Sequence, residues 1–380
     1  MARRPLLNPA LFLTVGFGFC SVGWGQFGGI DAEFAGGGAR ALAMGGAFIA
    51  LADDATATEF NPAGLWQLRT PEAALQVIYT REKRREPLLG RTFLEDESIF
   101  QNTTNEYPII PSFASYVYPM QHLVLGLTEF TNVYFDRSYK DSDVDFSTGE
   151  VVDFTGRDTG ANYAYGLTLA SGIVGDVVGG VTLRYNTFRF ESDLGLVGGS
   201  ESFHSEAFSA NAGLLWNFHP NLRIGAIYKS PQKLEGDYRG LDVDTQLPDT
   251  LGLGLAFLPD KRWRFLLDID HIWWSKFDPN ENDDFEKQDV WRYHAGAEWY
   301  AGRIKDTGVF LRAGYFYEDS NAFYYRGDNP LIAGLVPEPD PIHHYSFGLG
   351  LARRQYQLDF GIDLTNEDTI DLIVSTVVYF

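Results

Sequence analysis

Charged residues that could bind a ligand or brace a protein interior recur at every second position along several segments of the chain. In the segment 355–364, Asp359 and Asp363 alternate with Tyr356 and Leu358. Because successive side chains of a strand point to opposite faces, the charges share one face and the apolar residues share the other. Residues on such polar faces are Arg184, Arg223, Arg264, Asp268, Asp270, Arg292, His294, Glu298, Arg312, Asp359 and Asp363. Arginine forks bind carboxylates, so these faces predict either recognition of an anionic ligand or internal ion pairs.

Arg184 and Arg312 are the candidates for ligand binding, because aromatic residues lie on the same faces nearby. One or two cations in an otherwise apolar pocket are typical of a site for a hydrophobic molecule with a carboxylate. The predicted ligand-binding set is Arg184, Phe188, Phe190, Phe310, Arg312 and Phe316. The alternative is a network of arginine–carboxylate pairs that braces the interior, and the residues alone leave both open.

The residue types that support catalysis, metal binding or nucleic-acid binding do not form usable patterns. His204 and Ser205, like His343 and His344, are neighbours in strand-like segments, so their side chains point to opposite faces. No G-x-S-x-G motif occurs, and the single cysteine, Cys20, falls in a segment expected to be removed. The formal net charge of −21 opposes binding to nucleic-acid phosphates. We therefore predict no enzyme activity, no cofactor and no metal site.

The first 25 residues are organised like a secretory signal. Arg3 and Arg4 supply a positive start, residues 6–19 are mostly apolar, and small residues follow near the expected cleavage site. A lipoprotein signal would place a small residue before Cys20, where Phe19 stands. We predict that the chain is exported and that residues 1–25 are removed.

From residue 72 onward the chain divides into fourteen segments with the period-two alternation of β-strands. They are 72–81, 110–119, 121–135, 159–170, 176–190, 203–218, 221–233, 248–258, 262–275, 288–300, 307–318, 341–351, 354–365 and 369–380. No run of about 18 apolar residues follows the signal, so no transmembrane helix is available. A closed barrel is the other structure that pairs every backbone group in lipid. A soluble β-sandwich would alternate similarly, so the connections must decide.

Short and long connections alternate between these segments. The short links, such as 119–121 and 219–220, are tight turns. The long links, rich in charge, glycine and proline, are 82–109, 136–158, 191–202, 234–247, 276–287 and 319–340. This order is expected when one rim of a barrel faces the periplasm and the other faces outside. We predict an all-β fold: a 14-stranded antiparallel transmembrane β-barrel over 72–380, whose last strand ends in Phe380.

The segment 26–71 precedes the first strand and does not alternate. It is rich in glycine and alanine, carries Asp53 and Asp54, and contains an Asn-Pro-Ala-Gly turn at 61–64. A glycine-rich backbone can cradle phosphate, but no strand precedes this one and no Gly-Lys-Ser/Thr follows it. The favoured interpretation is a compact plug of small residues inside the barrel lumen.

The run GARALAMGGAFIALADDATATEFNPAGL (38–65) resembles the N-terminal hatch of the FadL/TodX family of outer-membrane transport proteins. The segment 247–277 looks like the mid-barrel pattern of that family, and the resemblance covers most of the mature chain. It implies a fourteen-stranded barrel, a hatch that closes the periplasmic end, and hydrophobic substrates that enter through outer loops. The residues assigned to the hatch are Asp53, Asp54, Asn61, Pro62 and Ala63.

The resemblance also implies a kink in the third strand that opens a side route beneath the hatch. In the third predicted strand, Leu125 and Leu127 share the lipid face, and continued alternation places Glu129 there too. A carboxylate in hydrocarbon is unfavourable, so we expect a bulge between Gly126 and Thr131 that turns Glu129 inward. The alternative is a glutamate close enough to the lipid headgroups to be tolerated.

The combined prediction is an outer-membrane transporter for hydrophobic small molecules, either long-chain fatty acids or hydrocarbons. Cargo would diffuse passively through a plugged barrel with lateral exit. The expected partners are the cargo, outer-membrane lipid and lipopolysaccharide, and the barrel is expected to be a monomer. The resemblance also reaches PorV-like barrels, which hold secreted proteins for a secretion system. A secreted-protein partner is therefore the alternative.

Overall fold

The computed structural model describes residues 36–87, 100–145, 150–193, 200–238, 241–277, 285–320, 323–328 and 340–380. The predicted signal and the first residues of the predicted plug lie outside this set. Among the described residues, no helix is both long and apolar enough to cross a membrane.

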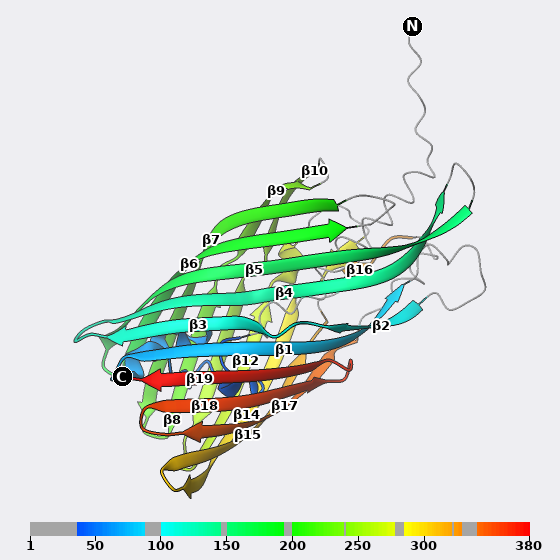
Figure 1. Cartoon of the computed structure of the whole chain (residues 1–380). Helices are drawn as coiled ribbons and strands as arrows, with labels where there is room; N and C mark the ends of the chain where they lie inside the picture. The colour runs from blue at the N-terminus through cyan, green and yellow to red at the C-terminus, as the bar shows by residue number, and fades with distance from the viewer. Residues whose placement is uncertain are drawn as a thin grey trace.

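Fourteen of the described strands form a closed antiparallel barrel (Figure 1). They are β1 (Glu72–Pro87), β3 (Ile110–Pro119), β4 (Val124–Asp145), β5 (Glu150–Val174), β6 (Val177–Asp193), β7 (Ser200–His219), β8 (Leu222–Lys229), β11 (Thr250–Phe257), β12 (Trp263–Ile272), β14 (Val290–Ile304), β15 (Thr307–Glu318), β17 (Ile342–Ala352), β18 (Tyr356–Thr365) and β19 (Ile370–Tyr379). The first and last strands pair from Glu72 with Tyr379 to Arg81 with Ile370, so the sheet closes on itself. The predicted barrel is confirmed, and a two-sheet sandwich is excluded.

The strands place apolar side chains outward and polar side chains inward, the reverse of a soluble protein. In β6, Thr182 and Arg184 are buried, whereas Leu183 between them is 60% exposed. In β11, buried and exposed residues alternate along the whole strand, and Leu253 points outward. Lipid accepts outward leucines, while polar side chains must find partners inside.

Some predicted outer links are strands, because the ladder continues beyond the alternating region. The predicted link 136–158 consists largely of the paired ends of β4 and β5. The predicted link 234–247 is largely a hairpin of β9 (Gln232–Tyr238) and β10 (Leu241–Leu247). A strand that leaves the membrane has water on both faces and does not need to alternate. The alternation of apolar and polar residues that identifies membrane-spanning strands therefore does not reveal the parts of strands that lie outside the membrane.

Residues 36–68, called here the inner segment, lie inside the barrel and are drawn in blue in Figure 1. The inner segment contains the short helices α2 (Ala39–Leu42) and α3 (Ala57–Phe60) and the 3-10 helix η3 (Pro62–Gln67). Met44, Phe48 and Leu51 are fully buried and share one apolar cluster with Phe113 and Val117 of the wall. The principal core of the protein is thus the contact between this segment and the barrel strands.

Candidate functional site

The barrel wall carries glycines where the inner segment touches it. A Cβ on Gly314 would lie 2.0 Å from the backbone nitrogen of Gly45, and one on Gly180 would lie 2.4 Å from the carbonyl carbon of Pro62. Other wall glycines whose Cβ would lie under 3.0 Å from the inner segment are Gly213, Gly225, Gly252, Gly254, Gly296 and Gly348. These glycines come from strands around the wall, so the inner segment rests on backbone at many points.

The Asn-Pro-Ala turn fastens the inner segment to itself and to the wall. Asn61 donates from Nδ2 to the carbonyl oxygens of Ile49 (2.9 Å) and Leu214 (3.0 Å). Its Oδ1 accepts from the backbone N–H of Ala63 (3.1 Å), which caps η3, and Pro62 occupies the first turn, where no N–H is required. The motif residues therefore have structural partners in this segment.

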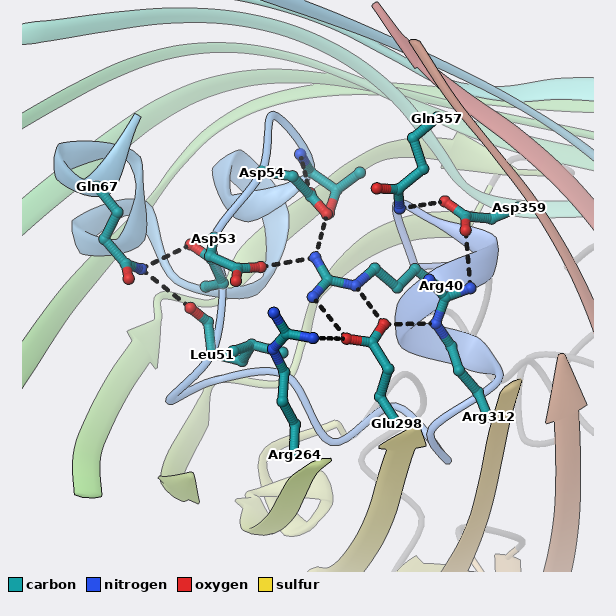
Figure 2. Close-up of polar contacts among 12 residues, drawn as sticks. Arg40, Leu51, Asp53, Asp54, Gln67, Arg264, Glu298, Arg312, Gln357 and Asp359 are labelled. Atoms are coloured by element: carbon teal, nitrogen blue, oxygen red, sulfur yellow. Dashed lines mark hydrogen bonds and ion pairs between the residues drawn. The ribbon is translucent and has the colours of Figure 1, made fainter. Parts of the chain in front are cut away.

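Arg40 is the centre of an ion network that joins the inner segment to the wall (Figure 2). Its Nη1 lies 2.6 Å from Asp53 Oδ1 and 3.0 Å from Asp54 Oδ2, and its Nε lies 3.0 Å from Glu298 Oε2. Burial alone would lower the pKa of Arg40, but the three surrounding carboxylates raise it well above its usual value. Arg40 is therefore held as a cation inside the protein.

Glu298 of β14 accepts hydrogen bonds from three guanidinium groups, which converge on it in Figure 2. Besides Arg40, these belong to Arg264 (2.5 Å) and Arg312 (2.7 Å), and Arg312 also pairs with Asp359 (2.7 Å). The side chains of Glu298 and Arg312 are each 1% exposed. A buried charge is costly without a partner, so each member of the network needs the others.

Further polar groups of the wall hold the inner segment on other sides. Glu59 forms ion pairs with Arg184 and with Lys229, the latter at 3.1 Å. Asp268 Oδ2 accepts from two consecutive backbone N–H groups at 48–49, at 2.7 and 2.8 Å. Among the described residues, no group of three or more His, Cys, Asp or Glu could hold a metal ion. These ion pairs and hydrogen bonds join the inner segment to the wall.

The six residues predicted to bind ligand do not form one pocket. Arg184 and Arg312 both pair with carboxylates of the chain, as the bracing alternative expects. Phe310 lies beside Arg312, with the guanidinium 5.8 Å from its ring centroid. Phe316 is stacked between His294 (4.4 Å) and His344 (4.3 Å). A role for these residues in cargo binding stays a prediction.

Phe188 and Phe190 belong instead to an apolar cluster near the long links, called here the outer cluster. Its members are Tyr107, Val133, Phe135, Phe188, Phe190, Phe203, Leu234, Tyr238, Val243, Ile272, Trp274, Phe277 and Val290. Phe190 packs against Phe135 (6.1 Å between ring centroids) and Tyr238 (5.8 Å). The cluster joins strands to the β9–β10 hairpin and to η4 (Trp274–Lys276), contacts that sequence alternation cannot show.

Lys287 lies against the outer cluster and was not identified from the sequence. It ends β13 (Phe285–Lys287), which pairs with β16 (Phe323–Tyr325). Its Nζ lies 4.1 Å from the ring centroid of Trp274 and 5.1 Å from that of Phe277. Burial lowers the pKa of Lys287 to about 7, although nearby negative charge acts in the opposite direction. An ammonium group that loses its proton near neutral pH thus borders the apolar outer cluster.

The wall also has a seam, defined here as the missing backbone pairing between β4 and the strands β3 and β2 (Phe100–Glu106). β3 pairs with β4 as far as Phe113 with Phe130, and from Thr131 onward the described residues of β4 pair with β5 alone. On the other side of the seam, β2 pairs with β1, and β4 diverges from it (Figure 1). The register of β4 shifts between Thr131 and Val133.

The predicted irregularity of the third strand is thus present but lies farther along, and the expected inward turn of Glu129 is wrong. The strand is regular between Gly126 and Thr131, so Glu129 stays on the outward side with Leu127. Glu129 is half-buried, and its Oε1 accepts a hydrogen bond from Thr131 Oγ1 (3.4 Å). Gly126 faces the inner segment, where a Cβ would lie 3.0 Å from Thr58 Cγ2.

Several solved structures have a similar fold. The toluene transporter TbuX of Ralstonia pickettii has 14% sequence identity and a TM-score of 0.63, covering 92% of this chain and 99% of that chain. The P. putida toluene transporter TodX has 17% identity and a TM-score of 0.65, with the same coverage. A FadL homologue of Pseudomonas aeruginosa has 12% identity and a TM-score of 0.59, covering 88% and 95% of the two chains. No curated protein sequence compared with the chain matches it.

The sequence itself matches a family model over residues 28–372, described as outer membrane protein transport protein (OMPP1/FadL/TodX). Members of this family are transport channels of the bacterial outer membrane and not enzymes. The match covers most of the barrel and the described inner segment. The chain therefore belongs to the OMPP1/FadL/TodX family of outer-membrane transport proteins.

Proposed function

We propose that this protein passes hydrophobic small molecules from the outer cluster sideways through the seam, by passive diffusion and as a monomer. Its family transports hydrophobic substrates across the outer membrane. The observation that supports a sideways exit is the missing backbone pairing between β4 and β2. Tyr107 and Val133, which lie beside this gap, belong to the outer cluster, so the cluster borders the gap. An apolar molecule in that cluster is next to a part of the described wall that backbone hydrogen bonds do not close.

In this proposal the inner segment, with the rest of 26–71, is a plug that stays seated during transport. A partly open polar pocket of about 770 Å³ lies at the rim with the short turns and is lined in part by Asp53, Arg69, Asp176 and Arg223. Between this pocket and the outer cluster stand the Arg40 network and the glycine contacts. A hydrophobic molecule on that route would have to separate buried ion pairs, which is strongly unfavourable.

The proposed cargo is a hydrophobic molecule with one carboxylate, such as a long-chain fatty acid. Lys287 supports this class, because it is 4% exposed and its Nζ lies on the aromatic rings that border the outer cluster. Hydrocarbons are the second class: TbuX and TodX are described as toluene transporters, and the rings of the outer cluster suit an aromatic molecule.

Affinity for dodecanoate is expected to fall about tenfold for each pH unit above pH 7, because binding then requires uptake of a proton. Burial lowers the pKa of Lys287 to about 7, so the ammonium is present below that pH and lost above it. The carboxylate of the fatty acid stays ionised throughout. Titration of the detergent-solubilised protein with dodecanoate, at several pH values between 6 and 9, measures this affinity. Lys287→Met should remove the slope, and Lys261→Met, at an exposed turn, should keep it. A flat profile for the unaltered protein contradicts the assignment.

Uptake by cells tests the proposed function itself. A Gram-negative host that lacks its own hydrophobic-substrate channels would express the full chain and be supplied with labelled dodecanoate or toluene. Uptake well above that of the empty host is expected for at least one of them. Arg184→Gln and Arg312→Gln enter the same assay as tests of their predicted roles. No uptake, together with a secreted protein that copurifies in equal amount, would contradict transport and support the interaction-barrel alternative.

A further inference from the structure

The seam differs from most of the wall in what holds its two sides together. Along most of the barrel, neighbouring strands are joined by ladders of backbone hydrogen bonds; the outer part of β7, whose pairing with β8 begins at Asn211, is another exception. Across the seam, the described residues meet instead through aromatic side chains, from Phe113 of β3 and from Tyr107, which follows β2. At the lower end, Phe113 and Phe130 contact each other edge to face with ring centroids 6.2 Å apart, where the paired part of β3 and β4 ends.

The next contact across the seam is a pair of tyrosines. The rings of Tyr107 and Tyr134 meet edge to face, with centroids 6.4 Å apart and planes at 90°. Tyr107 follows β2, and Tyr134 lies on β4 just beyond the register shift. The pair is thus the first bridge above the end of the ladder.

The Tyr107 ring is held by hydrogen bonds to β1, whereas the Tyr134 ring lies on β4 just after its register shift. Tyr107 is buried, its hydroxyl donates to Glu82 Oε2 (2.6 Å), and its backbone N–H donates to the carbonyl of Thr80 (2.9 Å). Both of these partners belong to β1. Tyr134 is half-buried. Two residues farther along β4, Asp136 forms an ion pair with the exposed Arg157 (2.6 Å between Oδ2 and Nη2). Tyrosine beside such charges is typical of the membrane–water interface.

We propose that Tyr107 and Tyr134 form the gate of the seam and select cargo by its cross-section. This inference rests on the proposed sideways exit. Molecules leave when the Tyr134 ring moves away from the anchored Tyr107 ring, a movement that separates the two rings without breaking a backbone hydrogen bond between strands. A narrow molecule needs a small displacement, whereas a broad polycyclic molecule needs the pair to part fully. Passage of broad molecules therefore depends most on these two residues.

Substitution of the pair tests selection by size. In the uptake assay, the double variant Tyr107→Ala/Tyr134→Ala should raise uptake of phenanthrene about tenfold while changing uptake of toluene far less, since the ring contact contributes up to about that factor. Tyr107→Phe keeps the ring but removes the hydrogen bond to Glu82, and should give an intermediate value. The matched control is Tyr293→Ala/Tyr317→Ala, a ring pair 5.9 Å apart on strands that are hydrogen-bonded to each other. An equal change for both molecules, or the same change in the control, overturns the proposal.

Cross-linking tests the gate in the opposite direction. A short bis-maleimide joining Tyr107→Cys and Tyr134→Cys should abolish uptake of both molecules, and the same linkage at Tyr293→Cys and Tyr317→Cys should not. The single native cysteine, Cys20, lies in the predicted signal, so competing linkage is not expected. If the unaltered protein takes up neither molecule, the proposed function fails. If it transports normally with the tyrosine sites linked, transport stands and the gate is overturned.

Discussion

Replacing Glu298 with Gln is expected to lower the free energy of unfolding by about 3–5 kcal/mol, because this buried carboxylate accepts hydrogen bonds from three guanidinium groups. Gln keeps the volume of the side chain but removes its charge. Arg312 would retain Asp359, and Arg40 would retain Asp53 and Asp54. Arg264 would lose the ion pair that joins it to the network. Urea unfolding of the barrel in phospholipid vesicles measures the change.

The control for Glu298→Gln is Asp368→Asn, which removes an ion pair with Lys83 at the exposed surface. That pair has a similar distance of 3.1 Å, but the Asp368 side chain is 72% exposed. Exposed pairs contribute at most about 1 kcal/mol, so this variant should be nearly neutral. Equal losses in the two variants would show that the network does not hold the inner segment.

Gly314→Ala is expected to displace the inner segment, because the new Cβ would lie 2.0 Å from the backbone nitrogen of Gly45. Backbone cannot rotate away as a long side chain can, so the loss of stability should reach about 1–3 kcal/mol or more. Limited proteolysis from the periplasmic side should cleave the inner segment of the variant faster. Gly308→Ala, on the same strand, is the control, since its nearest neighbour would lie at 3.4 Å. Equal cleavage of the two variants would contradict the proposed tight seating.

Most of the barrel was predictable because lipid imposes a simple rule on each spanning strand. Leu183 and Leu253 point outward and their neighbours point inward, so alternation identified the strands, and the short links identified one rim. The rule ends where strands leave the membrane. The outer parts of β4 and β5 pair with each other although their residues do not alternate in hydropathy.

The candidate site was predictable only in part, because alternation gives the direction of a side chain and not its partner. Arg184 and Arg312 do point inward, but the partner of Arg184 is Glu59, in a segment without periodicity. The roles of Lys287 and Tyr107 could not be recognised in the sequence, because each contacts a residue in another segment of the chain. The kink near Glu129 was expected from a family resemblance, yet local residue types could not fix the register shift after Thr131.

Uptake with the inner segment fixed to the wall distinguishes exit through the seam from passage beside the inner segment. The double variant Ala55→Cys/Ser115→Cys would join the inner segment to β3, at a point where Ser115 Oγ already donates to the carbonyl of Ala55 (2.8 Å). After oxidation, uptake of dodecanoate and toluene should equal that of the reduced variant, because cargo leaves through the seam while the plug stays seated. A loss of uptake on oxidation that reductant restores would instead show that cargo passes the inner segment and does not leave through the seam.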